Sequence, residues 1–120
     1  MPRNESYFSK DYSNLRENYT DKSGEYRESC ALIALGFANV LKKEGKNTNI
    51  IAIYGEIVDS SGRRKPLVPA LYNGRIQWGN HVVCESDGVI YDPIFESPMQ
   101  IEEYLATAFN QDVDIIKLNS

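Results

Sequence analysis

The sequence predicts a single α+β domain, in which one buried helix packs on a mostly antiparallel sheet. A long apolar helical segment lies in the first half of the chain, and short segments rich in β-branched and aromatic residues follow it. Asn-Gly and Asp-Gly pairs, which favour tight antiparallel hairpins, separate several of these segments. The chain has 120 residues, the size of one domain, so we expect residues 1–120 to form a single unit.

Composition narrows the functional classes. Hydrophobic residues make up 42% and charged residues 25%, as in an ordinary globular domain, and the net charge of −4 argues against nucleic acid as a partner. The one basic run, Arg63-Arg64-Lys65, is interpreted as a solvated loop. No apolar run approaches the ~20 residues of a membrane span, and Met1–Lys10 lacks a signal-peptide core. With two cysteines, we expect a reducing, cytoplasmic setting, or export as part of a longer protein.

Two helices are expected in the first 44 residues. Phe8, Tyr12, Leu15 and Tyr19 have helical spacing, which predicts a helix within residues 5–19, followed by a loop over residues 20–24. The segment Cys30–Glu44 is apolar almost all round, which predicts a buried helix. Ser29 is its candidate N-cap, and Gly45 is its stop.

The second half of the chain is predicted to be mostly strands. Strands are expected at residues 49–59, 67–72, 81–86, 89–92 and 113–118. Pro66 and Pro69 weaken the segment 67–72, which is therefore expected at an edge of the sheet. Asn73-Gly74 and Asp87-Gly88 are the expected hairpin turns. Ser97-Pro98-Met99-Gln100 combines a capping box with proline at the first helical position, which predicts a helix to about Asn110.

The Asp87-Gly88 turn places the only histidine beside an aspartate. A two-residue loop pairs Ser86 with Val89, so that Asp92 lies opposite Val83 and diagonal to His81, on the same face of the sheet. Diagonal neighbours are ~7–8 Å apart, within reach of an imidazole and a carboxylate. A loop with an odd number of residues would reverse the parity and remove the pair.

A histidine oriented by a carboxylate is the partner that a catalytic thiol requires. Cys30 is the candidate nucleophile, because a cysteine at a helix N-terminus lies in the positive end of the dipole. An imidazolium nearby can then lower a thiol pKa from about 8.5 to roughly 3.5–7.5. Cys84 has the opposite strand parity to His81 and is interpreted as a buried hydrophobic residue.

Taken separately, these residues favour structural roles. A single histidine in a strand and a single cysteine opening an apolar helix are each more often structural, and only their combination favours catalysis. A disulfide between Cys30 and Cys84 is disfavoured. A zinc site from both cysteines, His81 and Asp92 is also disfavoured, because structural zinc prefers short ligand spacings. We therefore predict no metal and no cofactor.

The chemistry-bearing segments resemble a known superfamily. A cysteine opens a helix that ends in Lys-Lys-Glu-Gly, a strand follows, and then come Gly79-Asn80-His81-Val82-Val83 and Gly88-Val89-Ile90-Tyr91-Asp92-Pro93. This order over roughly residues 25–95 resembles the papain-like and transglutaminase-like cysteine enzymes, including the arylamine N-acetyltransferases. It looks most similar to the small papain-fold domains of bacterial polymorphic toxins.

The resemblance implies a papain-like fold and a thiol-dependent hydrolase or acyl transferase. Cys30 would be the nucleophile, His81 the general base and then acid, and Asp92 the orienting residue. Papain-type enzymes carry a glutamine shortly before the cysteine, where this chain has Tyr26-Arg27-Glu28-Ser29. This departure argues against classical peptidase activity and leaves the second oxyanion donor unassigned, with Asn18 or a residue near Trp78 as candidates.

The expected substrate is a protein or peptide amide. Peptide hydrolysis, glutamine deamidation and transglutamination share the same first half-reaction and remain open. The toxin branch further implies a cognate inhibitor, or immunity, protein as a partner. Two alternatives are a non-catalytic protein-binding module on the same fold and a small-molecule acyltransferase with an apolar pocket beside Cys30.

Overall fold

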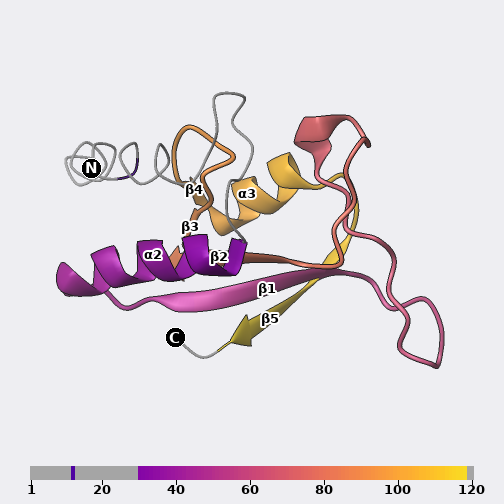
Figure 1. Ribbon diagram of the computed structural model, residues 1–120, viewed down its shortest axis with the longest axis horizontal. Helices are drawn as coiled ribbons and strands as arrows, with labels where there is room; N and C mark the ends of the chain where they lie inside the picture. The colour runs from indigo at the N-terminus through magenta and orange to yellow at the C-terminus, as the bar shows by residue number, and fades with distance from the viewer. Residues whose placement is uncertain (1–11, 13–29, 119–120) are drawn as a thin grey trace.

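The computed structural model describes Tyr12 and residues 30–118 (Figure 1). Their elements form an α+β fold, as predicted, with one five-stranded sheet in the order β4-β3-β2-β1-β5 and antiparallel neighbours throughout. The elements are α2 (Cys30–Lys43), β1 (Asn49–Gly55), the 3₁₀ helix η1 (Ala70–Tyr72), β2 (His81–Ser86), β3 (Val89–Tyr91), β4 (Met99–Gln100), α3 (Ile101–Ala108) and β5 (Val113–Leu118). The expected helix within residues 5–19, the loop at 20–24 and the Ser29 cap lie outside the described residues, apart from Tyr12.

The two faces of the sheet carry different helices. Alternate residues of β1 and β2 point to opposite faces. One set packs with α2, and its members are Ile50, Ala52, Val82 and Cys84. The other set, Ile51, Ile53 and Val83, packs with Tyr104 and Ala108 of α3. The sheet therefore separates two apolar clusters, and any group that contacts both must lie at an end of the sheet.

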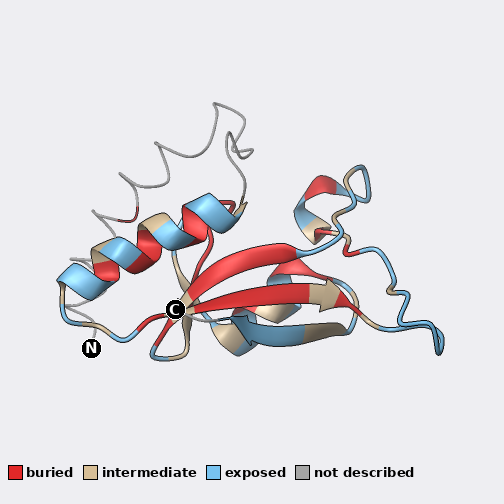
Figure 2. Cartoon of the chain, turned by 60° about the horizontal axis from the view of Figure 1, so that its bottom comes forward, coloured by how far each residue is buried: buried red, intermediate tan, exposed pale blue. Residues whose placement is uncertain are grey.

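Helix α2 is predicted correctly in position but not in burial. It buries the stripe Ile33, Ala34, Phe37, Ala38 and Leu41, whereas Leu32 and Leu35 are about half exposed, at 55% and 48%. Figure 2 shows this division as a red face against the sheet and a blue face away from it. The helix is thus amphipathic in its packing, because it covers a single sheet face instead of lying between two layers.

The Asp87-Gly88 turn is confirmed in detail. Both residues have positive φ, 53° and 82°, as a two-residue type I′ turn requires. The observed pairs are Ser86 with Val89, Glu85 with Ile90, and Cys84 with Tyr91, which is the predicted register. The loop therefore has an even number of residues, and the parity on which the His81–Asp92 pairing depends is correct.

Three predicted elements are wrong or misplaced. Residues 67–72 are not a strand: Leu67 and Pro69 form isolated bridges, and η1 follows, because prolines at 66 and 69 donate no ladder hydrogen bonds. The expected strand 49–59 ends at Gly55. The Asn73-Gly74 pair does adopt a turn with both φ values positive, but it follows the 3₁₀ helix and joins no two strands.

The predicted capping box at Ser97–Gln100 is also wrong. Met99 and Gln100 pair with Ile90 and Val89 as strand β4, and the helix begins only at Ile101. Gln100 occupies the N-cap position without a side-chain cap bond, and the helix ends at Ala108, before the expected Asn110. Pairing with β3 at the sheet edge therefore overrides the local helix-start signal.

The basic run is held by ion pairs and is not simply solvated. Arg64 Nη1 lies 2.7 Å from Asp114 Oδ2 of β5 and 2.8 Å from the carbonyl oxygen of Gly55. Arg63 and Lys65 pair with Asp59 and Glu56, with much greater exposure to solvent. Arg64 thus ties the 56–65 hairpin to the edge strand β5, which Figure 2 shows as largely exposed. No helix in the described part of the chain is long and apolar enough to cross a membrane.

Candidate active site

The site lies where α2 and β2 both begin. In Figure 1, α2 and β1 run in opposite directions, and β2 is antiparallel to β1. The first residues of α2 and β2, Cys30 and His81, therefore lie at the same end of the sheet. The backbone N–H of Val82 donates to Cys30 Sγ at 3.3 Å, which fixes the sulfur against the start of β2.

The three predicted site residues are brought together. His81 Nε2 lies 2.8 Å from Asp92 Oδ2, and these side chains are almost fully buried, with His81 1% and Asp92 2% exposed. Cys30 and His81 share a side-chain hydrogen bond. Because Asp92 occupies Nε2, the imidazole nitrogen left for the thiol is Nδ1. Cys30 is partly buried, unlike the fully buried Cys84.

Cys30 reaches the imidazole of His81 at the end of the sheet. By strand parity His81 lies on the α3 face, opposite Ile53 in β1, whereas Cys30 packs with the cluster on the α2 face. A residue one turn further along α2 would be separated from the imidazole by the strand. The sulfur and the ring can meet only because each belongs to the first residue of its element, so the N-terminal position of Cys30 is a geometric requirement.

The electrostatics favour a charged thiol–imidazole pair. Burial alone would raise the pKa of Cys30, but the hydrogen bond and charge of His81 and the Val82 N–H outweigh it, so that the pKa lies below its ordinary value of 9.0. Burial also opposes protonation of His81. The charge and hydrogen bond of Asp92 and the interaction with Cys30 prevail, and they raise the pKa of His81 to about 9. At neutral pH both shifts favour thiolate and imidazolium.

Cys84 has the opposite electrostatic environment. It is completely buried on the α2 face, as the parity argument predicts. Burial, together with the negative charge of Glu85, raises the pKa of Cys84 to about 12. At neutral pH this thiol is protonated and enclosed in the core, and it provides an internal reference for the reactivity of Cys30.

Asp92 is held by contacts that the sequence argument missed. Tyr104 of α3 donates its hydroxyl to Asp92 Oδ2 at 2.5 Å, and the Ile94 N–H donates to Oδ1 at 3.2 Å. The Tyr12 hydroxyl bonds the backbone carbonyl oxygens of Asp92 and Phe95. One sequence signal could have indicated this contact: Ile101, Tyr104, Leu105 and Ala108 recur at the spacing of one helix face. That spacing predicts a buried Tyr104, and a buried tyrosine hydroxyl requires a hydrogen-bond partner.

Trp78 covers one face of the imidazole. Its ring stacks on His81 with centroids 4.4 Å apart and an angle of 15° between planes. Tyr72 and Phe109 meet the indole edge-on at 6.4 and 6.5 Å. Trp78 is half-buried, and its stacking holds the orientation of the imidazole ring. The candidate oxyanion donor Asn18 lies outside the described residues.

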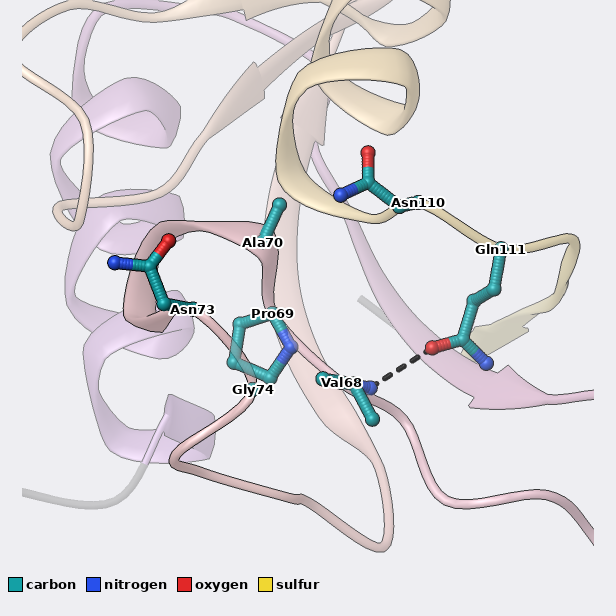
Figure 3. A pocket seen from close by; sticks show the side chains of 7 residues that line it. All are labelled: Val68, Pro69, Ala70, Asn73, Gly74, Asn110 and Gln111. Atoms are coloured by element: carbon teal, nitrogen blue, oxygen red, sulfur yellow. Dashed lines mark hydrogen bonds between the residues drawn. The ribbon is translucent and has the colours of Figure 1, made fainter.

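A recess lies next to the η1 region. It has a volume of about 340 Å³, and Figure 3 shows it between the η1 region and the segment after α3; its lining residues are Val68, Pro69, Ala70, Asn73, Gly74, Asn110 and Gln111. Gln111 Oε1 accepts the Val68 N–H at 2.9 Å, which ties the two walls together. The lining includes three carboxamides and no charged side chain, so it suits neutral polar groups better than ions.

The described residues form no metal-ligand cluster. Among residues 30–118 and Tyr12, no group of three or more His, Cys, Asp or Glu side chains is placed to hold a metal ion. The chemistry available from the described residues is that of a thiol, an imidazole and a carboxylate in series. Compared with known proteins, the chain matches no family model, no curated protein and no solved structure.

Proposed function

We propose that this protein is a cysteine-dependent acyl-transfer enzyme that acts on amides. The observation that supports this most strongly is the chain of contacts from Cys30 through His81 to Asp92, with pKa shifts toward a thiolate–imidazolium pair. A thiolate is the reactive form of cysteine, and an imidazolium beside it can protonate a leaving amine. Buried structural cysteines such as Cys84 lack both features.

The reaction is a two-step transfer. The Cys30 thiolate attacks the amide carbonyl carbon, and the carbonyl electrons move onto oxygen to give a tetrahedral oxyanion. The oxyanion collapses with cleavage of the C–N bond, His81 gives its proton to the departing amine, and a thioester remains on Cys30. His81 then takes a proton from water or an acceptor amine, whose attack on the thioester carbon releases the acyl group and restores the Cys30 thiolate beside the His81 imidazolium. Asp92 keeps the imidazole oriented throughout.

The backbone supports one part of the oxyanion hole. Cys30 is the first residue of α2, and N–H groups in the first turn of a helix have no intrahelical acceptor. Its N–H group and the positive end of the helix dipole are available to a developing oxyanion.

The substrate is proposed to be a protein or peptide. Peptide bonds and glutamine side chains both present the required amide, and the uncharged recess between the η1 region and the segment after α3 suits a neutral polar segment of such a chain. The resemblance to papain-like toxin domains supports, as a further part of the proposal, a papain-like fold, a role as a toxin-type effector and a cognate immunity protein as partner.

Trapping of the thioester tests the proposal. The protein is incubated with glutamine-containing peptides, with and without a primary amine, and quenched in acid. Mass spectrometry then follows peptide cleavage, the 1 Da change of deamidation, amine incorporation and acylation of Cys30. We expect one of these products with the wild type and with Cys84→Ala, and none with Cys30→Ala. Product formation that survives Cys30→Ala would refute the assignment. Absence of any product together with equally slow thiol labelling of Cys30 and Cys84 would favour a non-catalytic binding module.

A further inference from the structure

Two donors converge on one oxygen of Asp92. His81 Nε2 approaches Oδ2 from the sheet at 2.8 Å, and Tyr104 donates its hydroxyl to the same atom from α3 at 2.5 Å. The other carboxylate oxygen is occupied by the Ile94 N–H. All three side chains are at most 2% exposed, so bulk water does not compensate for changes in these bonds. The two hydrogen bonds at Oδ2 therefore share one acceptor in a poorly solvated environment.

Sharing an acceptor weakens each bond. A hydroxyl that donates to a carboxylate oxygen withdraws charge from it, and less charge remains to hold the imidazolium proton. Tyr104 is suited to this role because burial and the negative charge of Asp92 raise its pKa well above 10, so that it keeps its proton and remains a donor over the working pH range. The hydroxyl of Tyr12, by contrast, bonds the backbone carbonyl oxygens of Asp92 and Phe95.

The position of the Tyr104 ring is set independently of its hydroxyl. Phe95 and Phe109 pack edge-on against it, at 5.8 and 6.2 Å between centroids. A phenylalanine at position 104 would keep these ring contacts and remove only the donor. The effect of the hydroxyl on the charge of the site can therefore be separated from the effect of the ring on folding.

We propose that Tyr104 is a positioning residue that competes with His81 for Asp92 Oδ2, and thereby limits how tightly the carboxylate holds the imidazolium proton. This inference rests on the proposed function, because it concerns the proton that His81 must release to the leaving amine. If Asp92 held that proton too firmly, the imidazolium would be a poor general acid. Among the described residues, Cys30 from α2 and Tyr12 are titratable groups that interact with these side chains, and both are present in every variant below.

The test is a pH titration of the histidine by NMR in the wild type, Tyr104→Phe and Tyr91→Phe. The chain contains one histidine, so the imidazole signals need no assignment. We expect Tyr104→Phe to raise the pKa of His81 above its value of about 9, by about half a pH unit or more, and to move the ring N–H proton signal downfield as its bond to Oδ2 strengthens. Tyr91→Phe removes a hydroxyl from the other face of the sheet and should change neither signal.

The outcomes separate this inference from the proposed function. A Tyr104→Phe protein that is folded by circular dichroism but has an unchanged or lower His81 pKa would overturn the competition, even if its melting temperature falls. Failure of the proposed function would appear in the wild type instead, as Cys30 alkylation at pH 6 no faster than that of Cys84. Either result can occur without the other, because the titration needs neither substrate nor turnover.

Discussion

Removing the charge of Asp92 should convert the thiolate–imidazolium pair of Cys30 and His81 to a neutral thiol and a neutral imidazole. In Asp92→Asn the side chain keeps its shape, but the largest cause that raises the pKa of His81 is lost, and burial, which lowers this pKa, is opposed only by the smaller contribution of Cys30. The pKa should fall from about 9 to the ordinary 6.5 or below, a change of at least about 2.5 units, or about 3 kcal/mol. At pH 7.5 the imidazolium fraction would fall from about 97% to about 9% or less.

Two measurements on Asp92→Asn follow this change. NMR titration of the single histidine gives the pKa of His81, and the iodoacetamide alkylation rate of Cys30 at pH 7.5 should decrease at least about tenfold as thiolate is lost with its imidazolium partner. Asp87→Asn removes a carboxylate from the turn of the same hairpin and serves as the matched control, with both quantities unchanged. A His81 pKa that stays near 9 in Asp92→Asn would refute this electrostatic account.

Two further predictions concern stability. Gly55→Ala would place a Cβ 2.1 Å from the carbonyl oxygen of Lys65, so the free energy of unfolding measured in urea should fall by about 3 kcal/mol or more. Gly79→Ala, with open space around the position, is the control and should lower it much less. Equal losses in the two variants would contradict the packing described. In Cys30→Ala that thiol no longer titrates and no longer raises the pKa of His81, but Asp92 still raises it; the resulting stabilisation of the fold is complete below about pH 6.5 and is lost as pH rises toward about 9. The unfolding free energy of this variant should therefore fall by about 2–3 kcal/mol over that range, and a flat or rising profile would be inconsistent with the charged pair.

The parts of the site that could be predicted from sequence are those fixed by local geometry. Asp87-Gly88 determines the register of β2 and β3 through its turn type, and the register in turn fixes the faces of His81, Asp92 and Cys84. The helix that begins with Cys30 follows from its apolar pattern and its Gly45 stop. In each case a few adjacent residues contain the necessary information.

The errors occur where distant segments decide the structure. Met99 and Gln100 carry a helix-start pattern but pair with β3. The proline-weakened segment 67–72 is held by isolated bridges to Trp78 and Phe109 and by the Gln111 side chain, not by a continuous strand ladder. The hydroxyl of Tyr104 on Asp92 and the ring of Trp78 on His81 depend on how α3 and the loop before β2 pack. Tertiary contacts of this kind leave little trace in local sequence patterns.

The most direct test of the central claim is the pH dependence of Cys30 alkylation, with Cys84 as the internal reference. Peptide mapping after short exposure to iodoacetamide gives the rate at each cysteine from pH 5 to 9, in the wild type and in His81→Ala. Our account predicts rapid labelling of Cys30 near pH 6, little labelling of Cys84, and in His81→Ala a shift of the Cys30 profile toward that of an ordinary thiol, with a pKa of about 8.5. Slow labelling of both cysteines at pH 6, unaffected by His81→Ala, would contradict it.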